Sequence, residues 1–373
     1  MEEFDSIRLN EMTTTHKVLF QSASKLAQIK DKSVSLVVTS PPYPMIEMWD
    51  DIFSLHNPEI RKALNEYDGK LAFNLMHEEL DKVWTELYRV LIDGGIACIN
   101  IGDATRSING NFQLFCSHSR ILNNCSVIGF QILPVIVWRK QTNAPNKFMG
   151  SGMLPPGAYI TLEHEFVLIL RKGNKREFKS DLEKANRQKS AYFWEERNLW
   201  FSDIWTDLKG IKQSLNEKEL RKRSGAYPFE LPYRLINMFS VKGDLVLDPF
   251  LGTGTTTIAA IGSERNSIGI EIDEQFSSLI SERILESTSF LNNNIKERIQ
   301  RHNDFITKRK NSNEIPKHES ESNGFSVITR QEKSISIQFL ESIKKISDSE
   351  FIATYTDKPV LNNNYQIDLR TYY

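Results

Sequence analysis

Two short stretches of the chain carry residue types that could do chemistry. The first, Thr39-Ser40-Pro41-Pro42-Tyr43, follows a run of β-branched and apolar residues. Two consecutive prolines fix φ and remove two N–H donors, so the chain would leave a strand stiffly with its carbonyls free. The Ser40 hydroxyl and the Pro41 carbonyl could then accept hydrogen bonds from an exocyclic amine, while the Tyr43 ring could stack on a planar base. The competing interpretation is an ordinary Pro-Pro turn with a partly buried tyrosine.

The second stretch runs from a strand at 244–247 through a glycine turn into a helix, which is the geometry of a nucleotide-type cofactor site. Gly252 and Gly254 permit tight turns and close approach of a ligand, and the threonines that follow offer hydroxyls and free amides at a helix N-terminus. The stretch has neither the GxGxxG fingerprint nor the lysine of a phosphate-binding loop, so a cofactor without phosphates fits better.

The sequence places an acidic residue, Glu271, where a nucleotide-type cofactor site needs one. Glu271 ends the next strand, about 20 residues after the glycines, where an acid would bind ribose hydroxyls. In the alternative interpretation, the glycines only shape a turn and Glu271 is a solvated strand end. The candidate cofactor-binding residues are Asp248, Pro249, Phe250, Gly252, Gly254, Thr255, Thr256 and Glu271.

Composition limits the class of protein. The chain has 373 residues, a formal net charge of −1, 40% hydrophobic residues and 25% charged residues, which excludes global disorder and a wholly basic nucleic-acid coat protein. Apolar runs fall far short of the roughly 18 residues of a membrane span, and the acidic N-terminus has no signal core. Three cysteines without metal-ligand spacing indicate a reducing cytoplasm and no metal site. We therefore expect a cytoplasmic protein without a membrane partner.

The spacing of apolar residues predicts the elements that must position these motifs. Short β-branched runs alternate with amphipathic stretches, the pattern of βαβ units in an α/β fold with a mostly parallel sheet. A helix is expected over 80–91, where apolar residues recur at helical spacing, and another near 231–239. The expected strands are 17–21, 34–39, 95–101, 132–137, 165–170, 244–247 and 266–271.

Together, the two motifs resemble those of the amino-group DNA methyltransferases, which use S-adenosylmethionine to methylate N4 of cytosine or N6 of adenine. The Ser-Pro-Pro-Tyr motif precedes the glycine motif by about 200 residues, and this order resembles the permuted class called beta. The resemblance spans roughly 17–284 and includes His164-Glu165-Phe166 and Tyr227-Pro228-Phe229. It implies a Rossmann-like methyltransferase fold with circularly permuted motif order, in which both motifs follow neighbouring central strands.

The resemblance also implies the chemistry. Methylation of an amino nitrogen is direct transfer from a sulfonium, so Ser40, Pro41, Pro42 and Tyr43 would align and polarise the amine rather than attack it. The base must be flipped out of the duplex at a cost of a few kcal/mol. C5 methylation needs a Pro-Cys pair, and none of the three cysteines follows a proline.

By family resemblance, serine at the first motif position favours cytosine N4, while adenine N6 stays open. A methyltransferase acting on RNA or a protein glutamine, and a catalytically silent DNA-binding module, are further alternatives.

We expect five segments, of which the resemblance implies the first three and composition indicates the last two. They are a catalytic half (15–170), a target-recognition insertion (171–224), a cofactor-binding half (225–306), a linker (307–324) and a small C-terminal appendage (325–373). The insertion holds 15 Lys and Arg against 9 Asp and Glu, a net charge of +6, interleaved with aromatic residues, so we expect it to contact DNA phosphates and base edges. A solvated helical insertion with a small aromatic core is the alternative.

The expected partners are double-stranded DNA and a cognate restriction endonuclease, with the protein a monomer or homodimer. The loop 139–147 is a second candidate for DNA contact. Relatives often carry an acid after the first strand, where it contacts the cofactor adenine, whereas this chain has Gln21-Ser22-Ala23-Ser24. Asp103 resembles a family position that supports the pocket, and His56 and His164 are not assigned as general bases.

Overall fold

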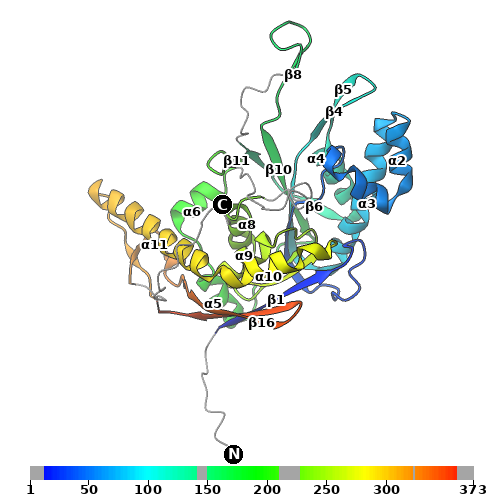
Figure 1. The fold of residues 1–373 in the computed structure, drawn as a ribbon. Helices are drawn as coiled ribbons and strands as arrows, with labels where there is room; N and C mark the ends of the chain where they lie inside the picture. The colour runs from blue at the N-terminus through cyan, green and yellow to red at the C-terminus, as the bar shows by residue number, and fades with distance from the viewer. Residues whose placement is uncertain (1–11, 141–148, 210–226, 322–323, 359–373) are drawn as a thin grey trace, which may run out of the picture.

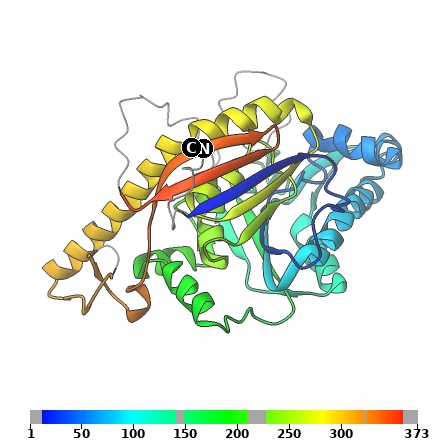
Figure 2. The same cartoon turned by 90° about the horizontal axis from the view of Figure 1, so that it is seen from below.

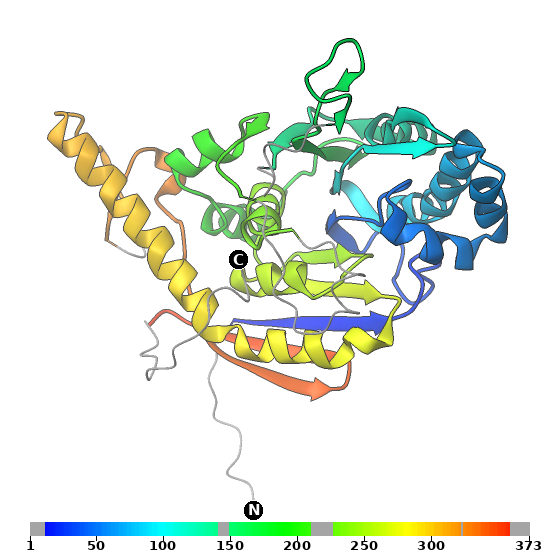
Figure 3. The same ribbon diagram turned by 45° about the horizontal axis from the view of Figure 1, so that its top comes forward.

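The computed structural model describes residues 12–140, 149–209, 227–321 and 324–358 (Figure 1). One large sheet forms the centre of this part of the chain, and helices cover both of its faces (Figure 3). Its strands are β1 (Thr13–Phe20), β2 (Val34–Thr39), β3 (Leu91–Ile101), β6 (Phe130–Ile132), β7 (Ile136–Arg139), β10 (His164–Lys172), β11 (Ile204–Trp205), β12 (Leu245–Asp248), β13 (Asn266–Glu271), β16 (Phe339–Ser347) and β17 (Glu350–Thr356).

The central strands of this 11-stranded sheet are parallel. The strand order is β11-β7-β10-β3-β2-β12-β13-β1-β17-β16, with β6 paired to β10. The pairs β3–β2, β2–β12, β12–β13 and β13–β1 are parallel, whereas β10 is antiparallel to β3 and β17 is antiparallel to β1. The structure therefore confirms the expected α/β fold with a mostly parallel sheet.

The remaining elements are short hairpins and helices. The hairpins are β4 (Ala104–Ile108) with β5 (Asn111–Phe115), β8 (Met149–Gly150) with β9 (Ala158–Tyr159), and β14 (His318–Glu319) with β15 (Ser326–Val327). The helices are α1 (Asp50–His56), α2 (Pro58–Asn65), α3 (Gly69–Val90), α4 (Ser117–Ile128), α5 (Asp181–Lys189), α6 (Trp194–Trp200), α8 (Glu230–Phe239), α9 (Thr255–Gly262), α10 (Ser277–Glu286) and α11 (Thr288–Asn311), with 3-10 turns η1 (Glu47–Trp49), η2 (Glu274–Phe276) and η3 (Arg330–Glu332).

The central strands are hydrophobic because both faces of the sheet are buried. In β2, Leu36 and Val38 pack in the core that α8, α9, α10 and α11 share, whereas Val37 packs in the core under α1 to α4. All three side chains are fully buried. Because consecutive side chains of a strand point to opposite faces, a run without polar residues is what a strand between two helical layers requires.

The C-terminal segment extends the main sheet. The helix α11 continues to Asn311, inside the segment expected to be a linker, and β16 and β17 form a hairpin whose inner strand pairs antiparallel with β1. Figure 2 shows these strands beside the N-terminal strand. The Tyr355 hydroxyl, on β17, donates a hydrogen bond to the Ile261 carbonyl at 2.9 Å. Residues 339–356, in the expected C-terminal appendage, are thus built into the main sheet.

The described part of the expected recognition insertion, residues 171–209, is built into the scaffold. Its aromatic residues Phe193, Trp200 and Trp205 are almost completely buried, and β11 pairs with β7 at the edge of the sheet. The Trp205 indole donates to the Trp200 carbonyl at 3.0 Å. These rings therefore match the alternative of an aromatic core and are not available to stack on bases. Residues 210–224 of the segment lie outside the described residues.

Across the described ranges, no helix combines the length and the apolar character needed to cross a membrane.

His77, on α3, makes folding sensitive to acid. It is fully buried, and within the described residues neither ring nitrogen has a hydrogen-bond partner. Burial, helped by the nearby Arg120, lowers the pKa of His77 to about 3. The unfolded chain would bind a proton near pH 6.5, so the stability that the neutral ring contributes is present above that pH and is lost as pH falls toward 3.

Between pH 8 and pH 5, we expect His77 alone to lower the free energy of unfolding by about 2 kcal/mol. Urea unfolding of wild type and His77→Leu at the two pH values measures this contribution. The variant should lose less stability on acidification, whereas His56→Leu, at an exposed position, should behave as wild type. An unchanged pH dependence in His77→Leu would contradict the expectation.

Candidate active site

The two motifs meet at the carboxyl edge of the central strands. The strands β2 and β12 are parallel neighbours, with Leu36 opposite Val246 and Val37 opposite Leu247. Beyond this register, the Thr39 hydroxyl donates a hydrogen bond of 2.6 Å to Oδ1 of Asp248. Two stretches about 200 residues apart in sequence thus leave the sheet side by side.

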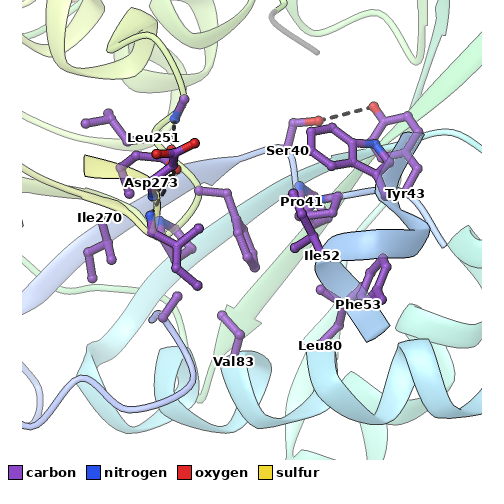
Figure 4. A pocket seen from close by; sticks show the side chains of 18 of the residues that line it. Ser40, Pro41, Tyr43, Ile52, Phe53, Leu80, Val83, Leu251, Ile270 and Asp273 are labelled. Carbon is purple, nitrogen blue, oxygen red and sulfur yellow. Dashed lines mark hydrogen bonds between the residues drawn. The ribbon is translucent and has the colours of Figure 1, made fainter. Parts of the chain in front are cut away.

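A pocket of about 350 Å³ lies between the motifs (Figure 4). This volume falls in the range of about 300–1,000 Å³ that small-molecule sites occupy. Figure 4 shows Ser40 and Tyr43 on one side, Leu251 and Asp273 on the other, and Val83 of α3 beneath. Of the residues expected from the sequence, the pocket is lined by Ser40, Pro41, Pro42, Tyr43, Pro249, Phe250, Gly252, Thr255 and Glu271.

Asp248, Gly254 and Thr256 are not among the lining residues. Asp248 is 2% exposed, and its carboxylate accepts hydrogen bonds from the hydroxyls of Thr39, Thr256 (2.5 Å) and Tyr227 (3.2 Å) and from the Phe250 amide (3.0 Å). Burial raises the pKa of Asp248, and these donors oppose that effect. Asp248 therefore holds the glycine turn against the Ser-Pro-Pro-Tyr strand from behind the pocket.

The glycine turn needs its glycines for conformation. Gly252 has φ of +55° and Gly254, the residue before α9, has φ of +86°. Side chains other than glycine rarely adopt this region. The Gly252 amide donates to Oε2 of Glu271 at 2.8 Å, which joins the turn to the end of β13.

Most hydrogen-bond acceptor positions of the Glu271 carboxylate are filled by backbone amides of the protein. Its carboxylate accepts from the amides of Gly252, Ile272 (2.9 Å) and Asp273 (3.0 Å), and burial raises its pKa against these hydrogen bonds. A carboxylate offers about four lone-pair sites, so roughly one remains for a ligand hydroxyl. Apolar side chains of Phe250, Leu251, Ile270 and Phe276 lie around it in the pocket. An apolar slot with the acids Glu271 and Asp273 at its edge fits a nucleoside.

The other side of the pocket holds a hydrogen-bond network. The Ser40 hydroxyl donates to the Tyr43 hydroxyl at 3.1 Å, which in turn donates to Oε2 of Glu165 at 2.9 Å. The Asn100 amide donates to both the Tyr43 oxygen (2.9 Å) and Glu165 (2.7 Å), and the Lys140 ammonium pairs with Oε1 of Glu165 at 3.0 Å. Burial and the adjacent Glu165 raise the pKa of Tyr43, so it stays a neutral hydroxyl.

Sequence reasoning gave Asn100, Lys140 and Glu165 no role in the pocket. A signal for Asn100 was present, because it is a polar residue in the otherwise apolar run of β3 and is 2% exposed. Buried polar groups need partners, so such a residue indicates a network. Gly102 also belongs here, because a Cβ at this position would lie 2.9 Å from the Tyr43 ring.

Of the other residues that the sequence analysis considered, some line the pocket and Asp103 does not. Residues 21–24, in the position where relatives carry an acid, line the pocket, and the hydroxyls of Ser22 and Ser24 are hydrogen-bonded at 2.9 Å. His56 also lines the pocket. Asp103 does not, and instead pairs with the His118 ring at 2.7 Å.

No group of three or more metal-ligating side chains occurs among the residues placed by the structure. Residues 141–147 of the second DNA-contact candidate lie outside them.

Comparison with known proteins decides the family. The model of the N6/N4 DNA methylase family matches residues 34–282, which contain both motifs. This chain belongs to the DNA methylase family.

Two relatives of this methylase share more than half of their aligned residues with it. It is 54% identical over 347 residues to the type II methyltransferase M.MthZI of Methanothermobacter thermautotrophicus, which covers 93% of this chain and 96% of that protein. It is 53% identical over 285 residues to the type II methyltransferase M.MjaI of Methanocaldococcus jannaschii, with 74% and 92% covered. The recognition of an amino-group DNA methyltransferase from the two motifs is thereby confirmed.

A solved structure shares the fold of the methylase. The DNA modification methylase TTHA0409 of Thermus thermophilus, crystallised in complex with S-adenosyl-L-methionine, is 32% identical with a TM-score of 0.56 and matches 72% of this chain and 93% of its own. The expected Rossmann-like methyltransferase fold is therefore confirmed.

Proposed function

We propose that this type II DNA methyltransferase transfers a methyl group to N4 of cytosine in double-stranded DNA, after the base has been flipped out of the duplex. The observation that carries the proposal is the pocket that Ser40, Pro41 and Tyr43 share with the glycine turn and Glu271. A cofactor on the turn and a base on the Ser-Pro-Pro-Tyr side would be in contact there, as direct transfer requires.

The cofactor is S-adenosyl-L-methionine, which supplies an electrophilic methyl group on a sulfonium. Phe250 and Glu271 would hold its nucleoside, through an apolar contact and a ribose hydroxyl respectively. Thr255, at the first turn of α9, would line the amino-acid end. Asp248, Gly254 and Thr256 would support these contacts from behind the pocket.

On the acceptor side, Ser40 Oγ and the Pro41 carbonyl would accept the hydrogen bonds of the target amine. Such acceptors draw the nitrogen toward a tetrahedral geometry, and they stabilise the positive charge that grows on it during transfer. The Pro41-Pro42 pair fixes the backbone that carries them. The Tyr43 ring, packed beside Gly102, would hold the flipped base.

Cytosine N4 is favoured by the serine at position 40, through the family resemblance, and adenine N6 is the second candidate. The type II relatives support a role in a restriction-modification system with a cognate endonuclease. DNA contact by residues 171–224 stays a prediction, since Phe193, Trp200 and Trp205 of that segment are buried in the core.

The experiment is methyl transfer from labelled S-adenosyl-L-methionine to duplex DNA, followed by digestion to nucleosides and identification of the product. N4-methylcytosine is expected. Label in N6-methyladenine would replace the cytosine assignment with the adenine one. Label in RNA or protein glutamine, with none in DNA of varied sequence, would overturn DNA methylation.

Glu271→Gln should weaken binding of S-adenosylhomocysteine about 10- to 100-fold. Loss of the charge removes one charge-assisted hydrogen bond to a ribose hydroxyl, a contact of about 1.5–3 kcal/mol. Isothermal titration calorimetry measures the affinity, and Glu274→Gln, an exposed acid three positions later, is the matched control. Equal affinities for the two variants would contradict a role of Glu271 in holding the cofactor.

A further inference from the structure

The Glu165 carboxylate determines which way the hydrogen bonds of the acceptor site run. An ionised carboxylate can only accept, so the proton shared by Tyr43 and Glu165 must belong to Tyr43. The Asn100 amide fills one acceptor position of the Tyr43 oxygen at 2.9 Å. The remaining acceptor position takes the Ser40 hydroxyl proton at 3.1 Å.

The direction of these hydrogen bonds determines that the lone pairs of Ser40, and not its proton, face the pocket. A hydroxyl has one proton and two lone pairs, and the proton of Ser40 is already committed to Tyr43. Within the part of the chain that the structure describes, both lone pairs of Ser40 are left for a donor in the pocket. An exocyclic amine offers only N–H donors in its planar ground state, so a serine turned this way is matched to it.

We propose that Glu165 is a positioning residue of the methyl-acceptor site, which acts through the Tyr43 hydroxyl to keep Ser40 an obligate hydrogen-bond acceptor toward the target amine. The proposal rests on the proposed function. Glu165 and Ser40 come from different strands, β10 and the end of β2, so the network also joins the antiparallel part of the sheet to the catalytic motif. Lys140, at 3.0 Å from the other carboxylate oxygen, compensates the buried charge.

Without an acceptor at position 165, the direction of the hydrogen bond between Ser40 and Tyr43 would reverse. The Tyr43 proton would have the Ser40 oxygen as an acceptor at 3.1 Å, which would occupy one Ser40 lone pair and free the Ser40 proton to turn into the pocket against the N–H groups of the amine. Two donors facing each other cannot form a hydrogen bond, so the contact that should strengthen in the transition state would be lost.

The test compares two nearly isosteric variants, Glu165→Gln and Glu165→Met. The glutamine keeps an oxygen acceptor for Tyr43, and the methionine does not. We expect kcat for methyl transfer to fall about 50-fold or more in Glu165→Met and by at most about fivefold in Glu165→Gln, with KM for S-adenosyl-L-methionine little changed in both. Glu163→Met, which removes a partly exposed acid that pairs with Arg139 just before β10, is the control for loss of a carboxylate.

Tyr43→Phe gives an independent measurement, because it keeps the ring and removes only the hydroxyl. It should lower kcat by an amount similar to Glu165→Met, and the double variant should be no slower than either single variant. Binding of S-adenosylhomocysteine to every variant establishes that the fold is intact.

A Glu165→Met enzyme with wild-type kcat would overturn the proposal, and so would equal losses in the methionine and glutamine variants. If wild type itself methylates no DNA, it is the proposed function that fails, and not the inference about Glu165.

Discussion

Ser40→Ala is expected to lower kcat for methyl transfer about 100- to 1,000-fold while affinity for S-adenosylhomocysteine changes less than about twofold. Ser40 would contact the amine of the base, and that contact strengthens as positive charge develops on the nitrogen. Loss of one such oriented group typically costs two to three orders of magnitude in kcat. The cofactor side of the pocket, around Leu251 and Asp273, lies opposite Ser40 and should be unaffected (Figure 4).

Single-turnover transfer with DNA in excess measures this loss, and calorimetric titration measures the cofactor-product affinity. Ser33→Ala, which removes a hydroxyl just before β2 rather than after it, is the matched control. If Ser40→Ala keeps near wild-type turnover, Ser40 is part of the scaffold and the acceptor role passes to the Pro41 carbonyl alone.

The placement of the two motifs could be predicted because a general rule of parallel sheets applies to it. Ligands bind beyond the carboxyl ends of the strands where the strand order reverses. Both the Ser-Pro-Pro-Tyr motif and the glycine turn directly follow buried strands, so their meeting did not require knowledge of side-chain contacts. The pairing of β2 with β12 and the hydrogen bond between Thr39 and Asp248 are what this rule implies.

The partners of Tyr43 could not be predicted in the same way. Asn100, Lys140 and Glu165 come from β3, from the residue after β7 and from β10, and the antiparallel register of β10 decides whether the acid faces the pocket. A one-residue shift in that register would turn Glu165 to the opposite face of the sheet. Sequence patterning does not determine such a register for strands joined by long connections.

The aromatic residues of the expected recognition insertion show a different limit of prediction from sequence. Aromatic side chains are frequent both in cores and on nucleic-acid-binding surfaces, so composition alone does not separate the two. In the structure, Trp200 and Trp205 are buried in the core, and the basic Arg176 pairs with Asp244 at 2.6 Å. The strand β17 was not predicted individually, and its pairing with β1, at the other end of the chain, has no local signal in the sequence.

Asp248→Ala should have the largest effect on stability, lowering the free energy of unfolding by about 3–5 kcal/mol. The carboxylate is the shared acceptor of three hydroxyls and one amide in a site without access to water. Each donor left unpaired in a buried site costs about 1–3 kcal/mol, partly relieved here because Tyr227 and Thr256 also hydrogen-bond to each other. The glycine turn would lose its attachment to β2, so S-adenosylhomocysteine affinity should fall together with stability.

Thr39→Val provides the matched comparison, because it removes only one of these hydrogen bonds at nearly constant volume. We expect it to cost about 1–2 kcal/mol in urea unfolding, since the Asp248 carboxylate keeps its other three donors. If Asp248→Ala unfolds at the same urea concentration as Thr39→Val, the remaining donors contribute nothing and Asp248 is not the centre of this network. A larger loss in Asp248→Ala, accompanied by weaker cofactor-product binding, would show that one buried carboxylate holds the cofactor turn against the catalytic strand.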